Sequence, residues 1–113
     1  MSTKQKSRGI PEKDWKLLRS LQQEKISAFC ERTLRKLGDT ITSKAATPLE
    51  TYKRVWEILT QEDNNLGLMF DDVKRSNALQ KLGAWRRFGL LSDDELSQLS
   101  EDTRRAVEFF STL

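Results

Sequence analysis

The sequence contains no histidine and a single cysteine, and these two shortages exclude most familiar catalytic centres. Histidine titrates nearest neutral pH and is the most frequent general base and metal ligand. Without it, a Ser-His-Asp triad, a Cys-His pair and a histidine-ligated zinc site cannot form. One cysteine also excludes multi-cysteine metal sites and an internal disulfide. We therefore expect a protein that is not an enzyme and that uses no metal or cofactor.

Long hydrophobic runs are also missing. The longest wholly apolar run is Leu68–Phe70, which is far too short to cross a membrane. The polar start, Met1–Lys6, is followed by no apolar stretch of the kind that a signal peptide needs. A lone cysteine is typical of a reducing compartment. These features predict a cytoplasmic protein with no membrane partner.

Aromatic and charged residues are both plentiful. Three Trp and five Phe stand in a chain of 113 residues, whereas disordered chains are poor in aromatics. Charged residues nevertheless make up 33% of the chain. We interpret this composition as one folded core beneath a heavily charged surface, at the size of a single domain.

The first helix is predicted to begin near Pro11, because proline is favoured in the first helical turn. It should end at Gly38, a residue suited to the left-handed helix stop. Its length of about 26 residues, roughly 40 Å, exceeds the width of about 35 Å expected for a compact domain of this size. One end should therefore project, or the helix should bend. At about 100° per residue, its main apolar face comprises Trp15, Leu18, Ile26, Phe29, Cys30, Thr33 and Leu37.

A second apolar patch lies on the opposite side of this helix and consists of Leu17, Leu21 and Ala28. Because the main face already packs within the domain, this patch needs a second neighbour in the chain or another subunit. It is our candidate oligomer face.

Three further starts are marked by capping signals. Thr47–Glu50 combines an N-cap, a first-turn proline and an acid three residues after the cap. The helix that follows should end near Gln61, and its apolar residues recur at helical spacing: Tyr52, Val55, Trp56 and Leu59. A third helix should run from Asp71 to Phe88 and stop at Gly89, and shorter helices should follow Ser92–Glu95 and Ser100–Thr103.

No segment alternates as a strand would. The sequence thus predicts an all-α fold, a small bundle of four to five helices with a long N-terminal helix. We expect a disordered basic arm over residues 1–9 and a single helical domain over residues 10–113.

Charge is divided unevenly along the chain. Residues 1–56 carry 13 Lys/Arg and 6 Asp/Glu, a net +7, and residues 57–113 carry 7 and 11, a net −4. Such asymmetry is found in nucleic-acid-binding proteins, and it also arises when two halves attract each other, within one chain or between two.

The best candidate for a nucleic-acid-binding surface is the basic-aromatic segment Lys81–Phe88. Interleaved cations and aromatics can hold phosphates and stack on bases. Alternatively, Trp85 and Phe88 belong to the core and the arginines are solvated or paired. A nucleic-acid-binding protein would use either the basic first half or the Lys74–Arg87 region. The candidate residues are Arg32, Arg35, Lys36, Lys53 and Arg54 in the first half, and Lys74, Lys81, Trp85, Arg86 and Arg87 in the second region.

The remaining reactive groups have structural interpretations. Cys30 lies on the apolar face of the first helix, where a thiol packs as a small hydrophobe. The acidic clusters Asp71-Asp72 and Asp93–Glu95 stand at predicted helix starts, where acids stabilise exposed amides. Our hypothesis is therefore a helical protein–protein interaction or regulatory module, a homodimer. A nucleic-acid-associated protein is the alternative.

Overall fold

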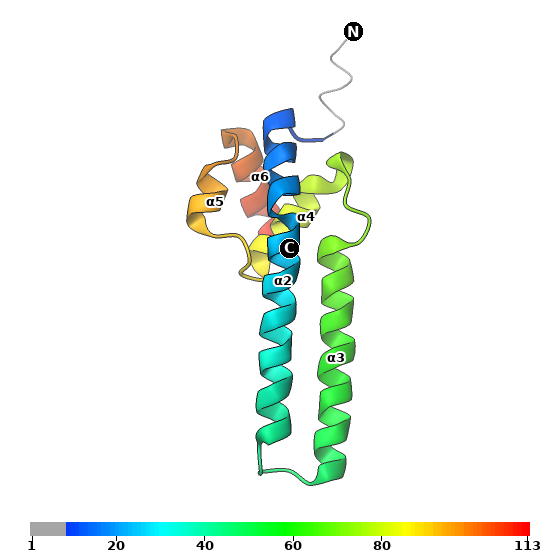
Figure 1. The fold of residues 1–113 in the computed structure, drawn as a ribbon. Helices are drawn as coiled ribbons and strands as arrows, with labels where there is room; N and C mark the ends of the chain where they lie inside the picture. Colours follow the sequence, from blue (N-terminus) through cyan, green and yellow to red (C-terminus); the bar gives the residue numbers. More distant parts are fainter. Residues whose placement is uncertain (1–8) are drawn as a thin grey trace.

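Two long antiparallel helices, joined by a short turn, form the elongated part of the molecule, and the first of them extends further, alongside the other helices (Figure 1). The structure is a computed structural model that describes residues 9–113, so the predicted basic arm lies, apart from Gly9, outside the described residues. Over residues 9–113 every regular element is helical, which confirms the all-α fold with a long first helix. The elements are α2 (Glu12–Thr42), α3 (Pro48–Phe70), the 3₁₀ turn η1 (Arg75–Asn77), α4 (Ala78–Arg87), α5 (Asp93–Ser97) and α6 (Glu101–Ser111).

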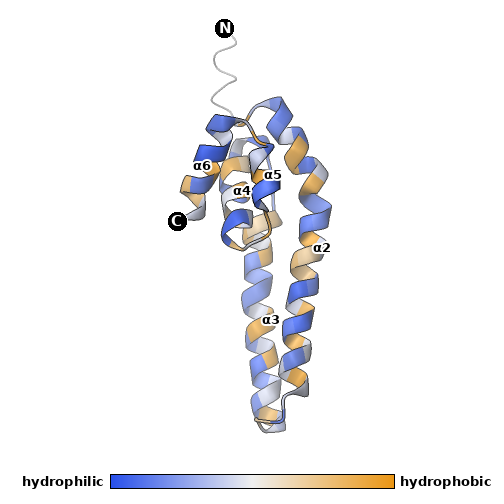
Figure 2. Ribbon diagram, turned by 90° about the vertical axis from the view of Figure 1, so that its left-hand side faces the viewer, coloured by the Kyte–Doolittle hydropathy of each residue, from blue (hydrophilic) through white to orange (hydrophobic). Residues whose placement is uncertain are grey.

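The α2–α3 pair, here called the hairpin, projects well beyond the other helices. Residues 75–113 form a head that packs at the open end of the hairpin, and the connecting turn lies at the far end (Figures 1 and 2). The described residues measure 64 × 24 × 23 Å. The expectation that one end of the first helix projects is therefore confirmed.

The predicted end of the first helix at Gly38 is wrong, because α2 continues to Thr42. Gly38 keeps a helical conformation, and no heavy atom of another part of the chain lies within 4 Å of where its Cβ would be. Glycine weakens a helix without forbidding it. The helix instead ends where Ser43 turns to extended backbone ahead of the next capping box.

The second helix also runs further than predicted. The capping box at Thr47 and Glu50 is confirmed, with both reciprocal hydrogen bonds present. However, α3 passes Gln61 and ends at Phe70, since the polar stretch after Gln61 contributes to the helix interface. Within it, Glu62 accepts a hydrogen bond from Lys36 across the hairpin at 2.8 Å. The polar residues after Gln61 therefore led to a wrong prediction of where this helix ends.

The third predicted helix is divided. Asp72 adopts a left-handed φ of 53°, which turns the chain back after α3, and α4 begins only at Ala78. The predicted stop at Gly89 is confirmed by its φ of 74°. The capping box at Ser92 is likewise confirmed as the start of α5.

The core lies where the head meets α2 and α3. Trp85 is fully buried at its centre, and its indole nitrogen donates to the carbonyl of Met69 at 3.1 Å. Buried around it are Leu18, Phe29, Leu82, Leu96 and Val107, among others. The outer half of the hairpin contributes nothing to this core.

A buried carboxylate ties the first helix to the last. Asp14, in the first turn of α2, has no exposed surface. Its Oδ1 accepts from the backbone N–H of Ser100 at 3.0 Å, and its Oδ2 accepts from the Thr103 hydroxyl at 2.6 Å. Asp14 thus caps α6 from across the molecule.

Glycine at position 83 allows α4 and α6 to pack closely. A Cβ added there would lie 2.5 Å from the Cβ of Phe110 and 3.0 Å from its backbone carbonyl carbon. Only a residue without a side chain fits this contact.

Two glycine substitutions should therefore have opposite effects. We expect Gly83→Ala to lower the free energy of unfolding by about 1–3 kcal/mol, because overpacking against a helix backbone outweighs the gain in helix propensity. Gly38→Ala, in open space within α2, should raise it by about 0.5–1 kcal/mol. Urea unfolding followed by circular dichroism measures both. Equal shifts in the two variants would contradict the close contact at Gly83.

Candidate protein interaction surface

Large hydrophobic side chains are exposed along the outer half of the hairpin. Their exposed fractions run from 52% at Leu59 to 68% at Tyr52. Figure 2 shows hydrophobic positions recurring along both helices as far as the turn. We call this set the hairpin face, and it comprises Leu34, Ile41, Leu49, Tyr52, Trp56 and Leu59.

The exposed side chains form two stripes that lie on the same side of the hairpin. Leu49, Tyr52, Trp56 and Leu59 follow one another at steps of three and four, so they share one flank of α3. A hollow of about 270 Å³ between the helices is lined by Leu34 and Leu59. Nearer the turn, Ile41 and Tyr52 line a second hollow. Residues of both helices therefore meet at one open apolar surface.

This surface corrects one reading of the sequence. Tyr52, Val55, Trp56 and Leu59 have the spacing of a packed apolar stripe, but only Val55 is half-buried. The flank of α3 that meets α2 is offset from it and carries the buried Ile58. Because apolar residues occupy both flanks of α3, periodicity identified the helix and not its buried side.

The head covers the opposite side of the hairpin. Arg32 donates to the carbonyl of Phe88 at 2.6 Å, and the rings of Phe29 and Phe88 meet edge to face with centroids 6.3 Å apart. On this side Lys36 binds Glu62, and this hydrogen bond lowers the pKa of the Glu62 carboxyl below its ordinary value. The hairpin thus has one polar side joined to the head and one apolar side left open.

The predicted oligomer face of Leu17, Leu21 and Ala28 is partly used inside the chain. Leu17 and Leu21 are half-buried and pack against the core, while Ala28 is exposed. The second neighbour that the sequence called for is therefore supplied to a large extent by the chain itself.

Several residues of the two candidate nucleic-acid surfaces make contacts inside the chain. Trp85 is fully buried, so it offers no ring for base stacking. Most of the basic side chains have partners within the chain. These are Arg32 with the Phe88 carbonyl, Lys36 with Glu62, Arg54 with Glu57, Lys74 with Asp72, Lys81 with the Leu68 carbonyl, Arg86 with Asp93 and Arg87 with the Phe110 carbonyl. Arg35 and Lys53 are exposed on the hairpin.

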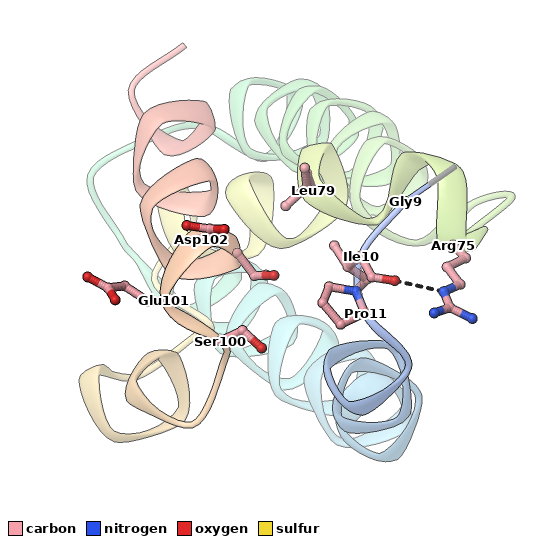
Figure 3. Close-up of a pocket in the computed structure, with 9 residues that line it drawn as sticks. Gly9, Ile10, Pro11, Arg75, Leu79, Ser100, Glu101 and Asp102 are labelled. Atoms are coloured by element: carbon pink, nitrogen blue, oxygen red, sulfur yellow. Dashed lines mark hydrogen bonds between the residues drawn. The ribbon is translucent and has the colours of Figure 1, made fainter. Parts of the chain in front are cut away.

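A hollow of about 700 Å³ lies between the segment that precedes α2, η1 and the start of α6 (Figure 3). Several of its polar groups have partners within the chain. Arg75 donates to the Ile10 carbonyl at 2.7 Å and to Glu12 at 3.0 Å, and the Ser100 N–H is taken by Asp14. Asp102 pairs with Arg105. These contacts hold the beginning of α2 against the head.

The remaining reactive residues lie apart. Cys30 is half-buried and lines the apolar hollow between α2 and α3. Asp93 and Glu95 stand at the start of α5 as predicted, but Asp71 is the C-cap of α3 and not a helix start. Within residues 9–113, no group of three or more acidic or cysteine side chains is arranged to hold a metal ion.

An ion pair joins the middle of α2 to α5. The Lys25 ammonium, 7% exposed, donates to both oxygens of Glu95 at 2.7 and 2.8 Å. Glu95 also accepts from the backbone N–H of Ser92 in the capping box. Burial raises the pKa of Glu95, but the hydrogen bonds from Lys25 and Ser92 outweigh it, so the pKa lies below its ordinary value.

This pair predicts a pH-dependent contribution to stability. Because the pKa of Glu95 is lower in the folded than in the unfolded chain, its contribution is present above about pH 4.3 and is lost as pH falls through the folded value. We expect Glu95→Gln to cost about 2–4 kcal/mol at pH 7, since the buried Lys25 loses its close counter-charge and keeps only the Glu24 carboxylate, at 4.0 Å. The difference from the original chain should shrink at pH 3. Urea unfolding at both pH values tests this, with the exposed Glu108→Gln as control; an equal cost at both values would contradict it.

The chain has no significant match to any protein-family model, curated protein or solved structure. Among the helices of the described residues, none has the length and apolar character required to span a membrane.

Proposed function

We propose that this chain is a non-catalytic, cytoplasmic helical module that binds another protein through the hairpin face. The observation that carries the proposal is the exposure of six large hydrophobic side chains on one projecting arm, each more than half exposed. A contiguous exposed apolar patch is characteristic of an interaction site, whereas scattered single hydrophobic residues are ordinary.

The chemistry of the face supports binding to protein. Tyr52 and Trp56 stand side by side on one helical flank, and tyrosine and tryptophan are the residues that most often dominate binding energy at protein interfaces. Burying apolar surface stabilises a complex by about 25 cal/mol per Å². The outer hairpin, which lacks a core of its own, has more apolar area to bury than its two helices can cover together.

The nucleic-acid alternative has less support. Two cations of the first half pair with acids of the second half across the fold, Lys25 with Glu95 and Lys36 with Glu62. Phosphate binding would compete with these pairs. They support the interpretation that the charge asymmetry serves attraction between the two halves of one chain.

Site-specific photo-crosslinking in cells tests the proposed surface. A benzophenone amino acid placed at Leu59 should form adducts with protein, because this position lies on the hairpin face. The matched control is Gln61, two residues on and about 200° around the same helix. Gln61 is exposed on the other flank of α3 and should give none.

The identity of each adduct is read by mass spectrometry. Adducts of equal yield at Leu59 and Gln61, or none at either, would refute an interaction surface on this flank. A specific adduct supports it whether the captured protein is another chain or a second copy of this one.

A further inference from the structure

We infer that the hairpin face binds a second copy of this chain, with the two hairpins antiparallel and side by side in a four-helix bundle. This inference rests on the proposed function, since it names the partner of the same surface. Three features of the face support it: the charges at its two ends, the position of Trp56 and its size.

The two ends of the hairpin face carry opposite charges. Near the turn, Lys44 lines the hollow that Ile41 and Tyr52 share. Near the head, Asp63 lines the hollow that Leu34 and Leu59 share. Both side chains are exposed, and neither forms a salt bridge with any residue of the range 9–113.

A two-fold axis that lies in the plane of the interface, at right angles to the long axis of the hairpin, makes the face complementary to itself. In a symmetric dimer the same patch of each subunit meets its partner. With antiparallel hairpins, the Lys44 end of one copy lies against the Asp63 end of the other, and this occurs twice. With parallel hairpins, like charges would meet at both ends. The charge pattern therefore selects the antiparallel arrangement.

The position of Trp56 fits the same axis. Trp56 lies eight residues after Pro48, where α3 leaves the turn, and seven residues before Asp63. It therefore stands about midway along the face, close to the axis, where the two copies of its ring would be buried together. The side chains that dominate binding cluster at the centre of interfaces and are most often tryptophan, tyrosine or arginine.

The size of the face suits a dimer of moderate affinity. From Leu49 to Asp63 the α3 side of the face is about 21 Å long, and two helices side by side are roughly 20 Å wide. Each copy would bury roughly 400 Å², or roughly 800 Å² in total, which is the size of a weak interface. We therefore expect dissociation in the micromolar range.

The head does not block this arrangement. It is joined to the other side of the hairpin, where Arg32 binds the Phe88 carbonyl. In the antiparallel dimer the two heads lie at opposite ends of the bundle, and the hairpin face of each copy stays free of them.

Sedimentation equilibrium of the full chain, from about 1 to about 500 µM, tests the inference. The original chain should be a monomer–dimer mixture with a micromolar dissociation constant. Leu59→Glu should be monomeric at every concentration, with an unchanged circular dichroism spectrum, because this side chain is 52% exposed. The control Gln61→Glu, on the other flank, should dimerise as the original chain does.

A charge exchange tests the antiparallel arrangement itself. Lys44→Glu and Asp63→Lys should each weaken the dimer about five- to tenfold at low salt, because each change replaces two attractions by two repulsions. The double variant exchanges the two ends and should dimerise within about twofold of the original chain. Parallel hairpins predict no such rescue, and its absence would overturn the arrangement.

A chain that stays monomeric at about 500 µM would overturn the inference. So would a dimer that survives Leu59→Glu and is lost in Leu17→Asp/Leu21→Asp, since this result would place the contact on α2 beside the head. If the crosslinker at Leu59 captures a different protein while the purified chain is monomeric, the proposed function stands and the second copy is excluded. Failure of both experiments removes the interaction surface altogether.

Discussion

The buried Asp14 carboxylate is the contact on which the rest of the head depends. An ionised carboxylate out of water is costly unless hydrogen bonds satisfy it. Here the Ser100 N–H and the Thr103 hydroxyl do so, which fixes the start of α6 against the start of α2. Eleven residues further along α2, Lys25 makes a second polar tie to Glu95. Because hydrogen bonds are directional, the contacts of Asp14 and Lys25 fix one position of the head along α2. Apolar packing alone would tolerate several positions.

Beyond the contact of Arg32 with the Phe88 carbonyl, toward the turn, the hairpin is no longer covered by the head. The head is closed around Trp85, and its polar groups are bound to one another. The outer hairpin is held by a narrow line of contacts, with Leu37 and Ile58 buried and Lys36 bound to Glu62. Most of its other large apolar side chains are exposed. The proposed interaction surface is therefore a direct result of continuing two helices past the end of the core.

Local signals in the sequence located the helix starts, and non-local contacts decided much of the rest. Thr47, Ser92 and Gly89 act through neighbouring residues, so their roles could be predicted. Gly38 and Gln61 resemble helix ends in the sequence. Each helix nevertheless continues past these residues, because it packs against the other helix of the hairpin. The candidate site was likewise only partly predictable from the sequence. Spacing identified Tyr52, Trp56 and Leu59 as an apolar stripe. Which flank of α3 is buried against α2 depends on the angle between the two helices, which local sequence does not give. Asp14 resembles an ordinary first-turn acid, and nothing nearby in sequence indicates Ser100 as its partner.

The separation of core and hairpin face has a consequence for how this chain can change over generations. Substitutions at Tyr52, Trp56 or Leu59 remove few contacts on which the head depends, because these side chains already face solvent. Exposed positions generally tolerate substitution at small cost in stability. Under the proposed function, the residues that would contact a partner and the residues that maintain the fold occupy different parts of the chain. The proposed partner preference could then change by substitution in the hairpin face while the head stays folded, without compensating mutations elsewhere.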